Sequence, residues 1–280
     1  MSYLVVADLH IHTNASDGTY TPEEIVQKAW EQGFSTIAIT DHDAIDNVFP
    51  TMQEGERLQV NVISGVELST ELGQGEIHIL GYCFSPADPF LLSALDQLRL
   101  SRMRRVTRTV ELLQQMGMCL DLNDVLAVAE GAAVGRAHVA RVLMARGYTS
   151  SIAEGFARFL GQGKPAYVSR ARCHTLEAID LIINAGGVPV LAHPGLSPAG
   201  LKYLPTLVDA GLAGLEVFYP QHSKEQEETF MQIAEDYDLL VTGGSDCHGA
   251  GKDQIYFGSV RLPDYYIRAL MMRAADLQTN

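Results

Sequence analysis

The sequence has few cysteines, and their arrangement does not suggest a structural site. Cys83, Cys119, Cys173 and Cys247 are the four cysteines among 280 residues, and no two of them form a Cys-x-x-Cys pair. Such wide spacing is typical of reduced thiols rather than of a disulfide framework or a zinc ribbon. We therefore expect a cytoplasmic protein whose fold does not depend on disulfides.

Long hydrophobic runs are also missing. No stretch approaches the roughly 18 apolar residues of a membrane-spanning helix, and no basic segment followed by an apolar one predicts a signal peptide. Positive charge is scarce, because 20 Lys and Arg against 34 Asp and Glu give a net charge of −14. We therefore expect neither a membrane nor double-stranded DNA as a partner. The sequence does not indicate an oligomeric state.

The positive charges that do occur are concentrated in one segment. Between Arg99 and Arg172 there are 12 Lys or Arg and 5 Asp or Glu, a balance of +7, which leaves −21 for the rest of the chain. Apolar periodicity predicts helices in and next to this segment, at 92–116, 122–130, 137–146 and 151–160. We expect residues 99–167 to form a helical insertion with an anionic ligand, and residues 1–98 and 168–280 to form the main domain. For any single charge, a solvated helix face is the alternative.

Outside this segment, predicted strands alternate with predicted helices. The apolar runs that predict strands lie at 4–6, 36–40, 60–66, 76–84, 188–192, 215–218 and 239–242. Alternation of this kind predicts a parallel sheet. About seven strands with polar residues at their C-terminal ends predict an α/β barrel of the TIM type rather than an open sheet.

Histidines and carboxylates that could bind metal ions gather at these strands and their ends. His10 and His12 are two residues apart, so in an extended strand their imidazoles point to the same face. The candidates on the other strands are His42, Glu67, His78, His193, Asp246 and His248. Mixed imidazole and carboxylate ligands suit borderline divalent ions better than magnesium or calcium alone. A His-x-His pair alone is equally consistent with two half-buried structural histidines.

Five short motifs carry a resemblance to a known family. They are Asp-Leu-His-Ile-His-Thr at 8–13, Thr-Asp-His-Asp at 40–43, Gly-Val-Glu at 65–67, His-Pro at 193–194 and Gly-Ser-Asp-Cys-His at 244–248. In this order they resemble the motifs of the polymerase and histidinol phosphatase (PHP) family, along the whole chain outside the insertion. The resemblance implies a distorted (β/α)7 barrel that usually binds three divalent metal ions, commonly manganese, zinc or iron, and hydrolyses phosphoesters.

The resemblance also implies a role for individual residues. The expected ligands are His10, His12, Glu67 and Asp246 for the first metal, Glu67, His78 and His193 for the second, and Asp17, His42 and His248 for the third. A carboxylate that bridges two cations brings them to roughly 3.5–4 Å, and water held there is acidified. Cys247 is expected to be a bystander.

The residue that protonates the leaving group is not evident. His222 follows a predicted strand and could be the acid, or it could be a histidine of a surface loop. Asp41 and Asp43 are expected to orient metal-bound imidazoles or to cap the next helix.

Two segments of the insertion resemble a PHP subgroup that acts on nucleoside 3′,5′-bisphosphates and on the 5′ ends of short RNAs. By position, Arg136, His138 and Lys164 would bind substrate phosphate, since guanidinium and ammonium groups suit phosphate oxygens. The alternative is that Arg136 and His138 are ordinary residues at the start of a helix.

Together these patterns predict a metal-dependent phosphoesterase that hydrolyses nucleotide phosphoesters with metal-activated water. A phosphatase for a small monoester such as histidinol phosphate is the alternative within the same chemistry. A non-catalytic metal-binding module and an amide or lactone hydrolase are further alternatives. The last usually employs a carboxylated lysine as its metal bridge, whereas Glu67 holds that position here.

Overall fold

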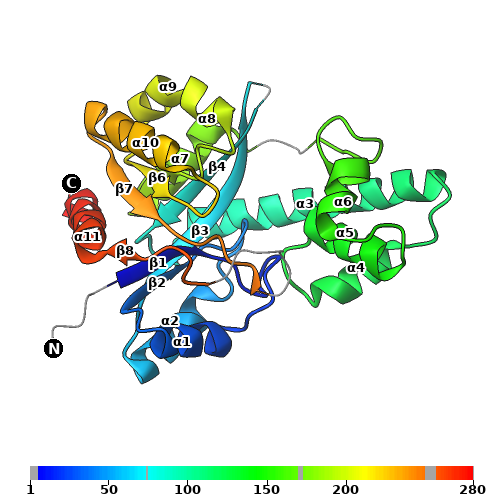
Figure 1. Cartoon of the computed structure of the whole chain (residues 1–280), viewed down its shortest axis with the longest axis horizontal. Coiled ribbons are helices and arrows are strands. Elements are labelled where there is room, and N and C mark those ends of the chain that lie inside the picture. The colour runs from blue at the N-terminus through cyan, green and yellow to red at the C-terminus, as the bar shows by residue number, and fades with distance from the viewer. Residues whose placement is uncertain (1–5, 74, 170–172, 250–256, 280) are drawn as a thin grey trace.

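The computed structural model describes residues 6–73, 75–169, 173–249 and 257–279, and shows an α/β barrel from which a helical lobe projects (Figure 1). Eight strands form one sheet in the order β7-β6-β5-β4-β3-β2-β1-β8. They are β1 (Val6–Ile11), β2 (Thr36–Ile39), β3 (Asn61–Leu72), β4 (Gly75–Tyr82), β5 (Val188–Leu191), β6 (Gly214–Phe218), β7 (Leu240–Gly243) and β8 (Leu262–Pro263). A parallel bridge between Ile11 and Cys247 brings the chain after β7 beside β1 and nearly closes the barrel. The predicted α/β barrel is confirmed, although Leu4 and Val5 of the first predicted strand lie outside the described residues.

Two strands of the sheet are antiparallel to their neighbours, and one of them, β4, runs against the predicted direction. β1, β2 and β3 pair in parallel, as do β5, β6 and β7, but β4 is antiparallel to β3 and β5, and β8 is antiparallel to β1. The expectation of a parallel sheet is therefore wrong at β4. The reason is the short link between β3 and β4, because parallel neighbours need a crossover of about a dozen residues.

The reversal at β4 changes the setting of two predicted ligands. β3 continues to Leu72, so Glu67 lies inside a strand rather than at its end. His78 lies in the first half of β4 and pairs with Ser69 of β3. Because β4 runs back along β3, the start of β4 and the end of β3 share the end of the barrel where the parallel strands terminate.

Helices cover the outside of the barrel. They are α1 (Pro22–Glu31), α2 (Val48–Leu58), α7 (Thr175–Asn184), α8 (Pro198–Lys202), α9 (Leu204–Asp209), α10 (Lys224–Asp236) and α11 (Asp264–Thr279). The predicted start of α1 is confirmed, since Thr21 and Glu24 form a capping box. In the part of the chain that the structure describes, no helix is long and apolar enough to cross a membrane.

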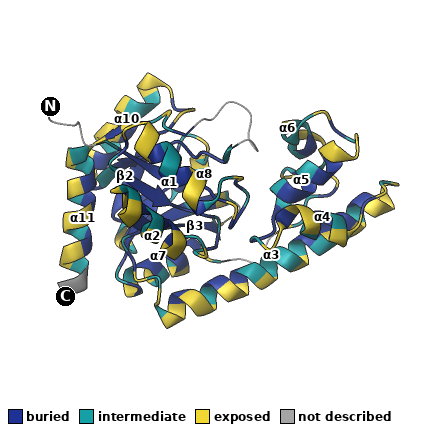
Figure 2. Ribbon diagram, turned by 90° about the horizontal axis from the view of Figure 1, so that it is seen from below, coloured by how far each residue is buried: buried dark blue, intermediate teal, exposed yellow. Residues whose placement is uncertain are grey.

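The helical lobe contains α3 (Pro89–Gln115), α4 (Leu122–Ala129), α5 (Arg136–Ala145), α6 (Ile152–Gly155) and a π-helical turn, η1 (Phe156–Leu160). Helix α3 serves two cores (Figure 2). Its first half buries Leu91, Leu95 and Leu98 against the barrel, whereas Val106 and Leu113 belong to a separate apolar cluster within the lobe. The lobe therefore has a core of its own, and the expected boundary at 98/99 falls inside one continuous helix.

Candidate metal centre

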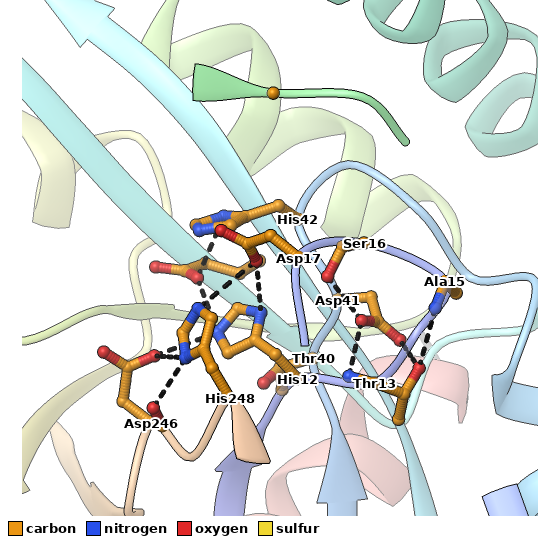
Figure 3. Close-up of polar contacts among 12 residues, drawn as sticks. His12, Thr13, Ala15, Ser16, Asp17, Thr40, Asp41, His42, Asp246 and His248 are labelled. Atoms are coloured by element: carbon orange, nitrogen blue, oxygen red, sulfur yellow. Dashed lines mark hydrogen bonds and ion pairs between the residues drawn. The ribbon is translucent and has the colours of Figure 1, made fainter. Parts of the chain in front are cut away.

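The nine side chains predicted as metal ligands lie at one end of the barrel. They are His10 on β1, His12 directly after it, Asp17 in the loop that follows, His42 after β2, Glu67 on β3, His78 on β4, His193 after β5, and Asp246 and His248 after β7. Eight of the nine form three overlapping groups in which the ligand atoms lie within 4.8 Å of one another: His10, His12, Glu67 and Asp246; His42, Glu67 and His78; and His12, Asp17, His42 and His248. Figure 3 shows Asp17, His42 and His248 pointing toward one another from three different loops.

Glu67 is at the centre of this cluster and is completely buried. Five imidazole nitrogens lie within 3.4 Å of its carboxylate oxygens: those of His78 and His193 beside Oε1, and those of His10, His12 and His42 beside Oε2. This arrangement brings His193, the ninth residue, into the cluster. A single carboxylate therefore contacts members of all three predicted ligand sets, as a bridging ligand must.

Buried polar atoms without hydrogen bonds test whether the cluster suits cations. His12 Nδ1, Asp17 Oδ1 and Glu67 Oε2 are buried and have no hydrogen-bond partner. Leaving such an atom unsatisfied costs about 1–3 kcal/mol. All three atoms are of types that bind divalent transition metals, and His12 belongs to one group of potential ligands with Asp17 and to another with Glu67. The residues present therefore fit divalent cations.

The charges in the cluster shift its proton affinities in opposite directions. Burial alone would lower the pKa of His12, but Asp246 and Glu67 beside it raise that pKa to about 9. Burial would raise the pKa of Glu67, but the surrounding histidines hold it well below its usual range. Protons and cations thus compete for the same atoms, so metal affinity is expected to rise with pH.

Glu216 on β6 belongs to the site and was not predicted. Its Oε1 lies 2.9 Å from His10 Nδ1, and its Oε2 accepts a 2.7 Å hydrogen bond from the backbone N–H of His193. The first contact favours a proton on Nδ1 and leaves His10 Nε2, which faces the cluster, free to act as a ligand. A lone carboxylate in the apolar strand Gly214–Phe218 was the available sequence signal.

Replacing Glu216 by Gln is expected to weaken metal binding about 10- to 100-fold, because the amide cannot accept from both partners. Metal affinity can be measured by competition with a chromophoric chelator. Glu225→Gln on the exposed face of α10 is the matched control and should leave the affinity unchanged. Equal affinity of both variants would show that Glu216 does not position His10.

Backbone strain also marks this end of the barrel. Asp43, His193 and Asp246 adopt positive φ angles of 50°, 26° and 50°. Residues other than glycine rarely adopt this conformation, and it clusters at functional sites. Tyr219 donates a 2.8 Å hydrogen bond to Asp246 Oδ2 and so helps to fix one of these residues.

The two acidic neighbours of His42 have other tasks than those we expected. Asp41 accepts hydrogen bonds from Thr13 and Ser16, and Figure 3 shows it turned toward that loop rather than toward the imidazoles. Asp43 accepts from Ser69 N–H and from Arg102 Nε, the latter at 2.6 Å. Neither caps α2, whose N-cap is Asn47. Asp41 therefore orders the loop that carries Asp17, and Asp43 ties α3 to the barrel.

Both ring nitrogens of His222 are engaged by the backbone. Nδ1 lies 2.8 Å from Val217 O, and Nε2 accepts from Gly195 N–H at 3.2 Å. Burial lowers the pKa of this imidazole. His222 thus braces the loop after β5, and in this arrangement it has no proton to give to a leaving group.

The three predicted phosphate ligands of the insertion are separated by the structure. Arg136 lines a cavity over the cluster, and its Nη2 lies 3.4 Å from the carboxylate of Glu76. His138 is buried, its Nδ1 accepts from Gly135 N–H, and burial lowers its pKa to about 4. Lys164 is exposed and does not line that cavity. Of these three residues, only Arg136 lines the cavity over the cluster.

Three further arginines line the same cavity as Arg136. Arg102, Arg105 and Arg141 share it with Asp17, His42, His78 and His248 in a hollow of about 190 Å³. We refer to this cavity as the arginine hollow. Arg141 also donates a hydrogen bond to the carbonyl of Asp17, and Ala133 N–H donates to Ala15 O, so the lobe holds the loop that carries a predicted ligand.

Comparisons with known proteins identify the family of this chain. The PHP domain profile matches residues 8–97. The chain is 38% identical to the 5′-3′ exoribonuclease Rnm of Escherichia coli K12 over 88% of this chain and 86% of that protein. It is 31% identical to the 3′,5′-nucleoside bisphosphate phosphatase of Chromobacterium violaceum, over 88% of each chain.

A solved structure supports the same assignment. A candidate metal-dependent phosphoesterase from Bifidobacterium adolescentis superimposes with a TM-score of 0.90 at 32% identity, covering 98% of both chains. The match includes the helical lobe as well as the barrel, since little of either chain is left out. The chain belongs to the PHP family, and it is a metal-dependent phosphoesterase.

Proposed function

We propose that this enzyme hydrolyses phosphate esters of nucleotides, with nucleoside 3′,5′-bisphosphates and the 5′ ends of short RNAs as its substrate class. The observation that carries the proposal is the arginine hollow, where four guanidinium groups share one cavity with the metal-ligand cluster. A phosphate at the cluster and a second phosphate beside it would both be neutralised there. The names of the Escherichia coli and Chromobacterium violaceum relatives describe substrates of this kind.

We further propose that three divalent ions of manganese, zinc or iron occupy the cluster. The ligand sets are those expected from the sequence, with Glu67 as the bridge, and the unsatisfied atoms of His12, Asp17 and Glu67 support them. Bound cations would neutralise phosphoryl oxygens and lower the pKa of a water molecule. The protein holds their ligands in place through Glu216, Asp41 and Tyr219.

Residues 99–167 are proposed as the substrate-binding domain on a barrel of residues 1–98 and 168–280. The arginines of the hollow differ in how strongly they pair with carboxylates of the protein. Arg102 forms a short ion pair with the buried Asp43 at 2.6 Å. Arg136 has a longer and weaker contact, at 3.4 Å, with the half-exposed Glu76. A phosphate dianion can replace the weaker partner, because bidentate contacts between arginine and phosphate are short and strong. Arg136 is therefore the residue proposed to bind the second phosphate.

The substrate class can be tested by phosphate release in the presence of manganese. The assay compares adenosine 3′,5′-bisphosphate, the two adenosine monophosphates, a short 5′-phosphorylated RNA and histidinol phosphate. We expect kcat/KM for the bisphosphate or the RNA to exceed that for histidinol phosphate by at least about tenfold, since one charge-assisted contact contributes roughly 1.5–3 kcal/mol. A preference for histidinol phosphate would overturn the proposal.

Replacing Arg136 by Ala is expected to raise KM for adenosine 3′,5′-bisphosphate about 10- to 100-fold, because one charge-assisted phosphate contact is lost. Metal content should stay at the wild-type level, because Arg136 contacts none of the ligand carboxylates of the cluster directly. Arg158→Ala is the control, since Arg158 lies on the same lobe and pairs with Glu154 at the surface. An unchanged KM for Arg136→Ala would exclude its role in phosphate binding.

A further inference from the structure

A second cavity, of about 710 Å³, also reaches the cluster, but its walls differ from those of the arginine hollow. The two cavities share His42 and His78 of the cluster, and Ile152 and Phe156 of the lobe. The apolar part of its wall includes Phe156 and Ile152 from the lobe and Leu196 and Tyr219 from the barrel loops. Among the residues that the structure describes, no arginine or lysine lines it. We refer to it as the apolar cavity.

The backbone around the apolar cavity is specialised at two points. Phe156 begins the π-helical turn η1. The π-helix is rare in proteins, and where it occurs it often lies at a functional site. Leu196 follows the predicted ligand His193 by three residues, its N–H donates to His193 O at 2.9 Å, and its side chain is 51% exposed. An accessible leucine and an accessible aromatic ring thus border one cavity beside a charged cluster. Such a surface fits a ligand with a flat, apolar part.

We propose that the apolar cavity binds the nucleobase of the substrate, with Phe156 as the stacking surface. This inference rests on the proposed function and adds the third part of the ligand. A nucleoside 3′,5′-bisphosphate has one phosphate to react, a second phosphate and a base. The protein offers a metal-ligand cluster, the arginine hollow and the apolar cavity, and all three meet at His42 and His78. Stacking on an aromatic ring tolerates any base, so the site accepts nucleotides as a class.

The test compares ligands that differ only in the base. The first measurement is kcat/KM for adenosine 3′,5′-bisphosphate and for the same bisphosphate on an abasic ribose. The second is calorimetric binding of adenosine 5′-monophosphate and of ribose 5-phosphate to the manganese-loaded enzyme. Wild-type enzyme should favour the ligand with a base about tenfold in both. Phe156→Ala and Leu196→Ala should each lose most of this preference and leave the base-free ligand within twofold, since stacking on an aromatic ring accounts for roughly 5- to 100-fold in affinity.

The ring of Phe156 lies 5.6 Å from the guanidinium of Arg136, so Phe156→Ala could weaken binding by displacing Arg136. Leu196→Ala is included because it removes a wall of the apolar cavity without removing this ring. A variant that acts through Arg136 would weaken both ligands equally, and that result would overturn the inference. Phe156→Trp should retain the preference, and Phe90→Ala, which removes an exposed ring at the start of α3, should not change it. Absence of any preference in the wild-type enzyme would also overturn the inference. If binding shows the preference but neither bisphosphate is hydrolysed, the proposed function fails while the base site stands.

Discussion

Replacing Glu67 by Gln is expected to lower kcat by about a thousandfold or more, since preorganised charge at a reacting centre commonly contributes factors of this size. The carboxylate has five imidazole nitrogens within 3.4 Å. An amide is neutral and has only one acceptor oxygen, so it cannot bridge two cations or balance the charge around it. Phosphate release under saturating substrate and metal content by mass spectrometry would be measured together. We expect metal content to fall along with kcat.

Glu71→Gln is the matched control for this variant. Glu71 lies on the same strand as Glu67, four residues further on, and it is outside the three groups of potential ligands. It should keep kcat within about twofold of the wild-type value. Circular dichroism should show the wild-type fold for both variants, since neither substitution opens a cavity in the apolar core. A Glu67→Gln enzyme with full metal content and normal turnover would refute the bridging role.

The sequence was sufficient to predict this cluster because its members obey a local rule. His10 and His12 are two residues apart at the end of β1 and belong to one group of potential ligands, and residues that follow parallel strands meet at one end of a barrel. Asp246 could be predicted to lie near these histidines without knowledge of long-range packing, because β1 and β7 end at the same end of the barrel. The resemblance to the family then supplied Asp17, whose own surroundings in the sequence carry little signal.

What could not be predicted depends on contacts between distant segments. Glu216 orients His10 across 206 positions of the chain, and nothing near either residue records that contact. His222 and His138 looked like chemical groups in the sequence, but backbone donors and acceptors occupy their ring nitrogens. The antiparallel β4 was missed because the alternating pattern of strands and helices gives no direction. The direction of β4 follows only from the short link before it, because that link is too short for a parallel crossover.

Replacing Gly244 by Ala is expected to lower the melting temperature by about 10 °C, which corresponds to roughly 3–5 kcal/mol for a chain of this size. A Cβ atom at position 244 would lie 2.3 Å from the backbone nitrogen of His10 and 2.4 Å from its Cβ. His10 is on β1, which is held between β2 and β8, so the backbone cannot move away cheaply. The glycine of the Gly-Ser-Asp-Cys-His motif therefore has a packing role in bringing the chain after β7 against β1.

The same substitution should also reduce metal binding, because His10 and Asp246 are both carried by the segments that it pushes apart. Thermal unfolding in chelator separates the two effects, since metal cannot stabilise the fold under that condition. Gly155→Ala in a helical segment is the control. Its Cβ would approach nothing closer than the Cβ of Ala140 at 3.3 Å, so its stability should change by less than about 1 kcal/mol. If Gly244→Ala melts with the control in chelator, the close approach of the two segments is not needed for folding. Gly244 would then matter only for placing the ligands.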